Sequence, residues 1–572
     1  MSRCLSAVLV ALAACTHAPA HVVAPPAAPL APLAPPAHHA VTISIIGTND
    51  LHGALVRLPL LAGYVANVRA ARAADGGGVL LLDGGDLFQG TLESNLGEGA
   101  DVIRAYGELG YAASAIGNHE FDYGPVGPAV TATAPDDDPR GALRARIAEA
   151  KFPFLVTNIG DDRTGKLIDW PNTTPGKLVE VAGVKLGLVG ATTEDTPTTT
   201  MPANFVGLHM MPTAAAIAGE ARALRAAGAQ VIVVVAHIGS ACKDVDNPDD
   251  TASCEQDAEL FRVIHALPPG LVDVWVGGHT HARVAHRIDG IAAIESLSSG
   301  RAFGRVDLRI EDGRIAHVDI HPPQLLCPLD ARGNAIALSE CHPEPYEGKP
   351  VLADAAIERI VVDALAKAGE RRAEKLGVTL ASAVTKEYRV ESAEGDLFTD
   401  LMLAARPEAD VALANGGGLR ADLPAGELTY GELFEAMPFD NRFALVTVTG
   451  AQLAAIVETN LERDNGILSW AGLAVKATCM RGKLALDLRV RGKPLRADHP
   501  YTIATSDFLA SGGDGLFAKV GLATGAVHDT SSIIREAVAD VLRARKGTIE
   551  PSRLGKRLDY PGKRPVTCEA KP

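Results

Sequence analysis

Short runs of β-branched and aliphatic residues recur along the first 320 residues, and each run ends in glycine or a polar residue. Seven of them have the length and composition of strands buried on both faces of a sheet: residues 41–47, 78–85, 112–117, 152–158, 185–191, 231–237 and 272–278. Helical patterns lie between them at residues 61–74 and 212–229. This alternation predicts an α/β sandwich over residues 41–345.

A second region follows a Pro-rich stretch at residues 321–350, which indicates a domain boundary. The sequence LADAAIERIVVDALAKAGERRAEKLG (352–377) has the spacing of a long amphipathic helix. We therefore expect a connecting helix within residues 346–378 and a second α/β or α+β domain over residues 379–565.

The first fifteen residues, MSRCLSAVLVALAAC, combine Arg3, an apolar run too short to span a bilayer, and Cys15 after Leu-Ala-Ala. They resemble a bacterial lipoprotein signal, in which Cys15 would be acylated and become the mature N-terminus. The alternative is a secretory signal cleaved nearby. Residues 16–40 are rich in Pro and Ala and predict an extended tether. We expect an envelope protein, periplasmic or at the outer membrane, whose membrane contact is a lipid anchor.

Six further cysteines agree with export to an oxidising compartment. They allow fifteen pairings, which sequence alone does not resolve. Proximity favours Cys242–Cys254 and Cys327–Cys341, which leaves Cys479–Cys568. None has CxxC spacing, so a structural zinc site is not expected.

The composition and net charge of the chain limit which classes of molecule it is expected to bind. A hydrophobic content of 47% with scattered charge describes a globular protein. The net charge of −15 argues against a nucleic-acid polymer, because phosphate-tracking surfaces need clustered Lys and Arg. A small anionic substrate is compatible with it, since one local cationic site suffices. The sequence does not predict an oligomeric state.

Polar residues follow five of the predicted strands where each strand ends, which is where α/β folds gather ligand sites. They are Asp50, His52, Asp83, Asp86, Asn118, His119, His237, His279 and His281. In Asp-x-His and His-x-His, alternate side chains of an extended segment face one ion. A mixed oxygen and nitrogen set without Cys suits Zn²⁺, Mn²⁺ or Fe²⁺. Any one of these histidines alone is more often a buried structural residue, but matched ligands on five segments favour a centre for two metal ions.

The ordered motifs D-x-H, G-D-x-x-x-G, G-N-H-E-F-D, a lone His and G-H-x-H resemble those of the calcineurin-like metallophosphoesterases. The stretch GNHEFDYG (117–124) is especially similar to the bacterial and animal 5′-nucleotidases, a family that includes periplasmic UDP-sugar hydrolases. The resemblance covers about residues 41–560. It implies a dimetal metallophosphoesterase domain followed by a C-terminal nucleotide-binding domain.

The resemblance also implies roles for individual residues. Two divalent ions, Zn, Mn or similar, would be held by two ligand sets that share Asp86: Asp50, His52, Asp86 and His281 in one, and Asp86, Asn118, His237 and His279 in the other. Some relatives carry an amide at the position of His281. His119 would stabilise charge on the phosphate, with Asp122 orienting its ring. Glu120 would anchor the loop, and Asp83 would be a structural turn residue.

Two stretches of the second domain, residues 412–441 and 505–517, match the nucleoside-binding half of the family. By this match Asn415 and Arg420 would contact the substrate. Phe439 and Phe508 would stack on the two faces of the base. Asp514 would accept hydrogen bonds from the ribose hydroxyls. Relatives carry a substrate-binding Arg three residues before a Glu or Gln. Here Tyr388 has that spacing from Glu391, and Arg389 follows one position later. Either a register slip keeps Arg389 in the site, or its contact is lost.

We therefore expect an exported phosphohydrolase that converts nucleoside 5′-phosphates to nucleoside and phosphate by attack of metal-bound hydroxide. The same parts build 2′,3′-cyclic-nucleotide 2′-phosphodiesterase/3′-nucleotidases and UDP-sugar hydrolases, which are the alternatives. A sulfur-ester hydrolase fits less well, because the two Phe motifs resemble base platforms. A catalytically inactive surface binding protein would have lost metal ligands, and every ligand position here carries a competent residue.

Overall fold

The structure is a computed structural model of the chain. It describes residues 40–568, apart from residues 128, 133, 329–335, 465, 518, 519, 524, 552, 553, 555 and 556. The expected signal, Cys15 and the tether up to residue 39 lie outside the described residues. Within the described residues, no helix is both long enough and apolar enough to cross a membrane.

Two large sheets form the first half of the described chain. The seven-stranded sheet has the order β16-β15-β1-β2-β3-β4-β7, with bounds β1 Ala40–Thr48, β2 Gly78–Asp83, β3 Ala113–Ala115, β4 Phe154–Leu155, β7 Thr173–Thr174, β15 Ala302–Glu311 and β16 Arg314–Leu325. The six-stranded sheet has the order β13-β14-β12-β11-β9-β8, with bounds β8 Gly176–Val181, β9 Val184–Thr192, β11 Val231–His237, β12 Val274–Val276, β13 Arg283–Ile288 and β14 Ile291–Ser296. A small third sheet contains β5 (Ile159–Asp161), β6 (Lys166–Leu167) and β10 (Leu208–Met210), which come between β4 and β11 along the chain.

Alternate residues of the central strands point into different cores, as the period of two requires. On β11, Val231, Val233 and Val235 join the core between the two sheets, whereas Ile232 and Val234 face the helices outside. Because both faces of these strands are buried, they read as continuous apolar runs rather than as alternating patterns. That is why the sequence identified them as buried strands.

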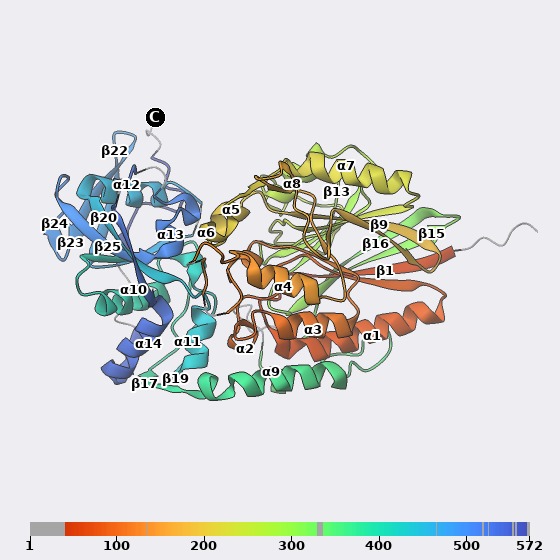
Figure 1. The fold of residues 1–572 in the computed structure, drawn as a ribbon, viewed down its shortest axis with the longest axis horizontal. Helices are drawn as coiled ribbons and strands as arrows, with labels where there is room; N and C mark the ends of the chain where they lie inside the picture. The colour runs from red at the N-terminus through yellow and green to blue at the C-terminus, as the bar shows by residue number, and fades with distance from the viewer. Residues whose placement is uncertain are drawn as a thin grey trace, which may run out of the picture. The chain divides into compact units, whose positions relative to one another are not determined.

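Helices cover the outer face of each sheet (Figure 1). On the seven-stranded sheet these are α1 (Leu58–Ala74), α3 (Ala100–Leu109) and α4 (Gly141–Glu149), and on the six-stranded sheet they are α7 (Thr213–Ala226) and α8 (Glu259–Ala266). The predicted α/β sandwich is confirmed.

The second half of the chain is also built of sheets and helices. A five-stranded sheet has the order β21-β18-β25-β20-β26, with bounds β18 Val411–Asn415, β20 Arg442–Thr449, β21 Leu468–Ala471, β25 Pro500–Ser506 and β26 Val527–Ile533. Smaller sheets contain β17 Lys375–Leu380, β19 Gly426–Thr429 and β27 Gly547–Ile549, and β22 Leu473–Met480, β23 Lys483–Val490, β24 Lys493–Pro494 and β28 Leu558–Asp559. The helices include α10 (Ala393–Ala405), α11 (Tyr430–Ala436), α12 (Gly450–Leu461) and α14 (Ile534–Arg545).

The helix between the halves is shorter than the amphipathic pattern at 352–377 suggested. Helix α9 spans Ala355–Ala373, and the side chain of Asp354 caps its first turn by accepting from the N–H groups of Ala356 and Ile357. The chain then enters β17, where Leu376, Val378 and Leu380 are buried and alternate with exposed residues. Pairing with β19 and β27 makes this segment a strand, although the amphipathic pattern ran on to Gly377.

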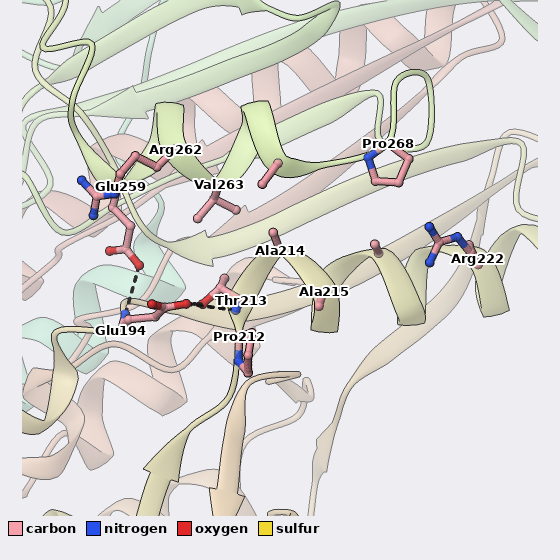
Figure 2. A pocket seen from close by; sticks show the side chains of 12 residues that line it. Glu194, Pro212, Thr213, Ala214, Ala215, Arg222, Glu259, Arg262, Val263 and Pro268 are labelled. Atoms are coloured by element: carbon pink, nitrogen blue, oxygen red, sulfur yellow. Dashed lines mark hydrogen bonds between the residues drawn. The ribbon is translucent and has the colours of Figure 1, made fainter.

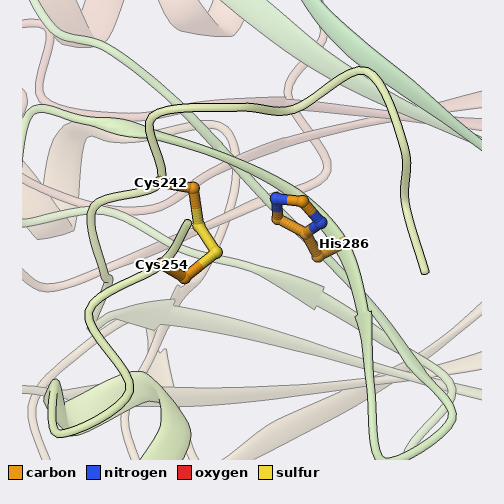
Figure 3. A group of neighbouring side chains, drawn as sticks. All are labelled: Cys242, Cys254 and His286. Carbon is orange, nitrogen blue, oxygen red and sulfur yellow. A yellow bond between two sulfur atoms is a disulfide. The ribbon is translucent and has the colours of Figure 1, made fainter. Parts of the chain in front are cut away.

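Three disulfides join Cys242 to Cys254, Cys327 to Cys341 and Cys479 to Cys568. Sequence proximity favoured the first two pairs, and the third is the pair that they leave. The buried ring of His286 lies beside the Cys242–Cys254 bridge (Figure 3). Because both sulfur atoms are in a disulfide, this group offers a metal ion the imidazole and no thiolate.

Candidate active site

The polar residues predicted from the strand ends come together at one edge of the two sheets. Strands β1, β2 and β3 run parallel, as do β11 and β12, so their carboxyl ends collect on the same side. The two sheet edges approach closely because they meet at glycines. A Cβ built on Gly84 would lie 2.5 Å from the carbonyl oxygen of Gly277.

Five of the candidate ligands have a left-handed backbone. The φ angles are +50° at Asp50, +50° at His52, +58° at Asp86, +84° at His279 and +57° at His281. This region is uncommon for residues other than glycine, although Asp and His are enriched there. Such conformations persist where surrounding structure imposes them, and they cluster at functional sites. Backbone hydrogen bonds impose them here: Asp50 N donates to Gly85 O (2.9 Å) and His52 N donates to Asp86 O (3.0 Å).

One group of converging ligand atoms contains Asp50, His52 and His281. The Nε2 atoms of His52 and His281 are 2.9 Å apart, and they lie 3.8 Å and 3.3 Å from Asp50 Oδ1. Asp86 Oδ2 is 3.8 Å from His52 Nε2. The Nδ1 atom of His52 donates to Gln89 O (2.8 Å), which turns Nε2 toward the group.

A second group contains Asp86, Asn118, His237 and His279. His237 Nε2 is 3.1 Å from Asp86 Oδ2 and 3.0 Å from Asn118 Oδ1. His279 Nδ1 is 3.1 Å from the same Asn118 oxygen. His237 Nδ1 donates to Gly84 O (2.8 Å), so this ring also presents its Nε2 atom inward. Asp86 Oδ2 therefore lies near both groups, and Asp50 also converges with Asp86 and His237, so these two carboxylates lie between the groups.

Buried carboxylates dominate the electrostatics of the two groups. Burial disfavours charge on His237, but Asp86 outweighs this effect and raises the pKa of the ring to about 10. Burial would raise the pKa of Asp50, yet His281 and His237 hold it well below its usual range. By contrast, burial and the neighbouring His237 lower the pKa of His279 to about 3. The negative charges of Asp86 and Asp50 therefore favour cations at this centre. The His279 ring is neutral near pH 7, so a nitrogen lone pair of that ring is free to bind a cation.

His119 and Asp122 form a pair beside these groups. His119 Nδ1 is 2.6 Å from Asp122 Oδ2, and the ring centroids of His119 and His52 are 5.5 Å apart. Burial lowers the pKa of His119, but Asp122 and Asp86 outweigh it, so the pKa lies above the ordinary value. The arrangement favours a charged imidazolium next to the two ligand groups.

Two buried acidic residues hold segments of the site together through hydrogen bonds. Glu120 accepts from the N–H groups of Asp86 (2.9 Å), Leu87 (2.6 Å) and Gly117 (2.6 Å), and so joins two loops of the site. Asp83 accepts from Thr48 (2.6 Å) and Tyr106 (2.9 Å). These contacts agree with the anchoring role expected for Glu120 and the structural role expected for Asp83.

Two residues from the second half of the chain reach this centre. Arg420 Nη2 donates to the Nε2 atoms of His52 (3.1 Å) and His281 (3.3 Å). The ring of Phe439 lies 5.4 Å from that of His119, and the guanidinium of Arg420 lies 5.7 Å from the Phe439 centroid. Among the expected substrate contacts, these two adjoin the metal-ligand groups.

Asn415, Phe508 and Asp514 form a neighbouring group on the strands and loops of the second half. Asn415 Nδ2 donates to Asp514 Oδ2 (2.8 Å), and Asp514 has a φ of +54°. The half-buried ring of Phe508 packs directly on Gly513, where an added Cβ would lie 2.5 Å from the ring. A flat aromatic surface and a carboxylate are thus held next to each other.

The side chain of Arg389 contacts residues outside the set of expected substrate contacts. Its guanidinium forms ion pairs with Asp464 (2.7 Å) and Glu255 (3.4 Å), and 54% of the side chain is exposed. Within the described part of the chain, the structure does not bring it to Arg420 or Asn415. The ring of Tyr388, one residue earlier, lies against Gly466 and close to Gly417.

Sequence analysis missed several residues that hold the site. Glu295 accepts from Thr280 Oγ1 (2.7 Å) and from Ser240 N (3.1 Å), which fixes the loop between His279 and His281. Gln89 is buried and accepts from His52 Nδ1 with its backbone carbonyl, whereas its side-chain amide has no hydrogen-bond partner among the described residues. No local motif marks either residue, because Glu295 reaches segments distant in the sequence and Gln89 bonds His52 through its backbone.

A cavity of about 590 Å³ lies away from these residues, between α7 and α8 (Figure 2). Small apolar residues such as Ala214, Ala215 and Val263 line it, with Arg222 and Arg262 among the charged ones. None of the predicted metal-binding residues lines this cavity, so the candidate site is the cluster of converging polar side chains and not the cavity.

Comparisons with known proteins cover both halves of the chain. Residues 43–283 match the sequence profile of the calcineurin-like phosphoesterases, and residues 372–520 match that of the 5′-nucleotidase C-terminal domain. Protein UshA of Yersinia enterocolitica is 26% identical over 505 residues, which cover 83% of this chain and 86% of the relative. A 5′-nucleotidase of Vibrio cholerae is 26% identical over 575 residues, covering 94% and 95%.

The fold has a close counterpart among solved structures. A 5′-nucleotidase precursor from Thermus thermophilus superimposes with a TM-score of 0.71 at 23% identity, covering 91% of this chain and 99% of that one. The likeness therefore extends over both halves.

Proposed function

Because the chain belongs to the 5′-nucleotidase family, with a calcineurin-like phosphoesterase domain and a 5′-nucleotidase C-terminal domain, we propose that it hydrolyses nucleoside 5′-phosphates to nucleoside and phosphate. The chain is a metal-dependent phosphoester hydrolase. The observation that carries the substrate proposal is the position of Arg420 and Phe439, which adjoin the ligand groups that share Asp86. We also propose domain boundaries of 41–345 and 379–565, with the connecting helix within 346–378.

The donor atoms fit two divalent ions. Carboxylate, imidazole and amide oxygen donors suit Zn²⁺ or Mn²⁺, and two ring Nδ1 atoms donate to backbone carbonyls as ligating histidines do. One ion would be held by Asp50, His52, Asp86 and His281, and the other by Asp86, Asn118, His237 and His279. Such ions supply Lewis-acid polarisation of the phosphoryl group and activation of water.

The remaining residues act on the phosphate and its leaving group. His119, charged and oriented by Asp122, stabilises negative charge that develops on the phosphoryl oxygens. Arg420 donates to a phosphoryl oxygen from the side of the second domain, since its guanidinium already reaches the His52 and His281 rings. Asp514 accepts from the ribose hydroxyls, and Asn415 holds its carboxylate in place.

Phosphate release from AMP tests the substrate proposal, and cleavage of UDP-glucose (to UMP and glucose 1-phosphate) and of 2′,3′-cyclic AMP (to a nucleoside monophosphate) is measured in parallel by separating the products. We expect AMP to be the best substrate of the three. Faster turnover of UDP-glucose or of the cyclic nucleotide would replace the proposed substrate class with that of the better substrate.

We further propose that Phe439 and Phe508 hold the base between them, and Phe508→Ala tests this. Loss of one stacking face costs about 1–3 kcal/mol, so kcat/KM for AMP should fall roughly 5- to 150-fold. Hydrolysis of p-nitrophenyl phosphate, which has no base, should change little. Steady-state kinetics on both substrates and the melting temperature are measured together.

Phe517→Ala is the matched control. This ring is 5% exposed and belongs to the hydrophobic core next to Phe508. Truncating it should lower stability by about 3–5 kcal/mol without a bias between substrates. If Phe508→Ala behaves like Phe517→Ala, Phe508 is a core residue and the stacking proposal fails.

We propose that the protein is exported and anchored by lipid on Cys15. Cys15→Ser should then leave the membrane fraction or fail to mature, whereas Cys4→Ser, in the same segment, should behave as wild type. Fractionation and the mass of the mature N-terminus are the measurements. Normal processing and membrane retention of Cys15→Ser would refute the lipid anchor.

A further inference from the structure

Three consecutive residues, Thr199 to Met201, each contact a residue of the proposed catalytic machinery. Asn118 Nδ2 donates to Thr199 O (2.9 Å). The hydroxyl of Thr200 and the backbone N–H of Met201 both donate to Asp122 Oδ1, at 2.9 Å and 3.2 Å. Each of these contacts joins residues at least 78 positions apart in the sequence, and no motif pointed to the segment.

The two oxygen atoms of the Asp122 carboxylate have different partners. Its Oδ2 atom lies 2.6 Å from His119 Nδ1, while its Oδ1 atom accepts from Thr200 and Met201. A carboxylate held by one oxygen can rotate about its Cβ–Cγ bond, since that torsion is broad. Holding the second oxygen fixes the plane of the group, and with it the direction in which His119 presents Nε2.

The segment is itself held firmly. Thr200 is 1% exposed and follows α5 (Thr196–Thr199), whose Thr196 hydroxyl donates to Thr193 O (2.7 Å). Thr193 Oγ1 in turn donates to Glu259 Oε2 on α8 (2.6 Å). Helix α5 also lies against η5 (Gly513–Gly515), the turn that carries Asp514. The position of Thr200 is therefore set by elements on both sides of the site.

We propose that Thr200 is a positioning residue for hydrolysis, which acts by fixing the orientation of Asp122 and, through it, of His119. The proposal rests on the catalytic role proposed for His119. It assigns the hydroxyl of Thr200, and not merely its bulk, to the placement of the imidazole against the phosphoryl group. Turnover should depend on this hydroxyl more than substrate binding does, because the imidazole is required in the transition state.

Thr200→Val and Thr200→Ser separate the hydroxyl from the shape of the side chain. Valine keeps the volume and removes the donor, so kcat should fall about 10- to 100-fold, the usual effect of losing a partner that orients an active-site group. KM, bound metal and melting temperature should stay near their wild-type values. Serine keeps the donor and should restore most of kcat. The fall should be similar for AMP and for p-nitrophenyl phosphate, because Asp122 and His119 serve both.

Thr198→Val is the matched control within the same segment. Its hydroxyl is exposed and donates to Asp195 O (3.0 Å) rather than to the site. This variant should keep the activity of wild type. If it loses as much activity as Thr200→Val, the segment tolerates no valine and the hydroxyl of Thr200 has no special role.

A spectroscopic measurement makes the test independent of the substrate. The proton between His119 Nδ1 and Asp122 should give a low-field proton resonance that is absent from His119→Asn. Thr200→Val should shift or broaden this resonance and Thr200→Ser should preserve it, whether or not AMP is the substrate. An unchanged resonance and unchanged kcat in Thr200→Val, or an equal loss in both Thr200 variants, would overturn the proposal. Loss of AMP turnover in wild type with retained p-nitrophenyl phosphate turnover would instead count against the nucleotide substrate alone.

Discussion

Asp86→Asn is expected to lower phosphate release by well over about 100-fold, the upper range for residues that only orient a ligand, and to lower bound metal at the same time. Asp86 Oδ2 is 3.1 Å from His237 Nε2 and 3.8 Å from His52 Nε2, so it belongs to both proposed ligand groups. Asparagine keeps the size of the side chain but removes the negative charge that the two proposed ions would share. Metal content of the purified protein and kcat on AMP are the two measurements.

Asp83→Asn is the control for this variant. Asp83 ends strand β2, three residues before Asp86, but its carboxylate accepts hydrogen bonds from Thr48, Tyr106 and the N–H of Gly85. Its replacement should affect the melting temperature more than metal content. Full metal occupancy in Asp86→Asn would show that Asp86 is not a shared ligand, whatever happens to activity.

His119→Asn is expected to lower kcat by roughly 10²- to 10³-fold, the range for losing one donor to a developing negative charge, while bound metal stays near wild type. His119 contacts the ligand groups through its backbone N–H, which donates to Asp86 Oδ1 (2.9 Å). Its ring is instead paired with Asp122. Removing the imidazole therefore takes away charge stabilisation without removing a proposed ligand. Equal metal loss in His119→Asn and Asp86→Asn would contradict this division of roles.

The pH dependence gives a second test of His119. Although burial lowers its pKa, Asp122 and Asp86 raise the pKa of the ring above the ordinary value, so the imidazolium persists to higher pH. If the charged ring is the active form, kcat of wild type falls as pH rises through that raised pKa. His119→Asn should lack this basic limb. His265→Asn is the matched control, because His265 forms a similar pair with Asp289 (2.7 Å) at the exposed end of α8.

Sequence pattern predicted those parts of the site that depend on local structure. The apolar runs located β1, β2, β3, β11 and β12, and the polar residues at their ends come together as candidate ligands, because parallel strands deliver their carboxyl ends to one edge. The same reasoning explains why the sandwich fold was predictable. Each of these inferences uses residues that are close in the chain.

Contacts between distant segments were not predictable in this way. The stretch TEDTPTTTMP (193–202) has the composition of an ordinary polar loop, and nothing in it indicates that Thr200 reaches Asp122, 78 residues earlier. Likewise, the expected helical pattern ran on through Lys375, Leu376 and Gly377, but these residues begin β17, which pairs with β19 and β27. The direction of Arg389 depends on Asp464 and Glu255, which no motif links to it.

The left-handed backbone of Asp50, His52, Asp86, His279 and His281 restricts how this centre can evolve. Among side chains, asparagine, aspartate and histidine enter that conformation most readily, whereas β-branched and bulky residues are outliers there. The residues that the backbone tolerates are thus largely residues that bind cations. Backbone geometry limits which replacements these five positions tolerate: glycine fits there and would remove the donor atom, whereas the side chains that fit most readily carry one. Mutations that keep a ligand at these positions therefore exchange one ligand type for another. They change which metal ion is preferred, while the loops keep their backbone conformation.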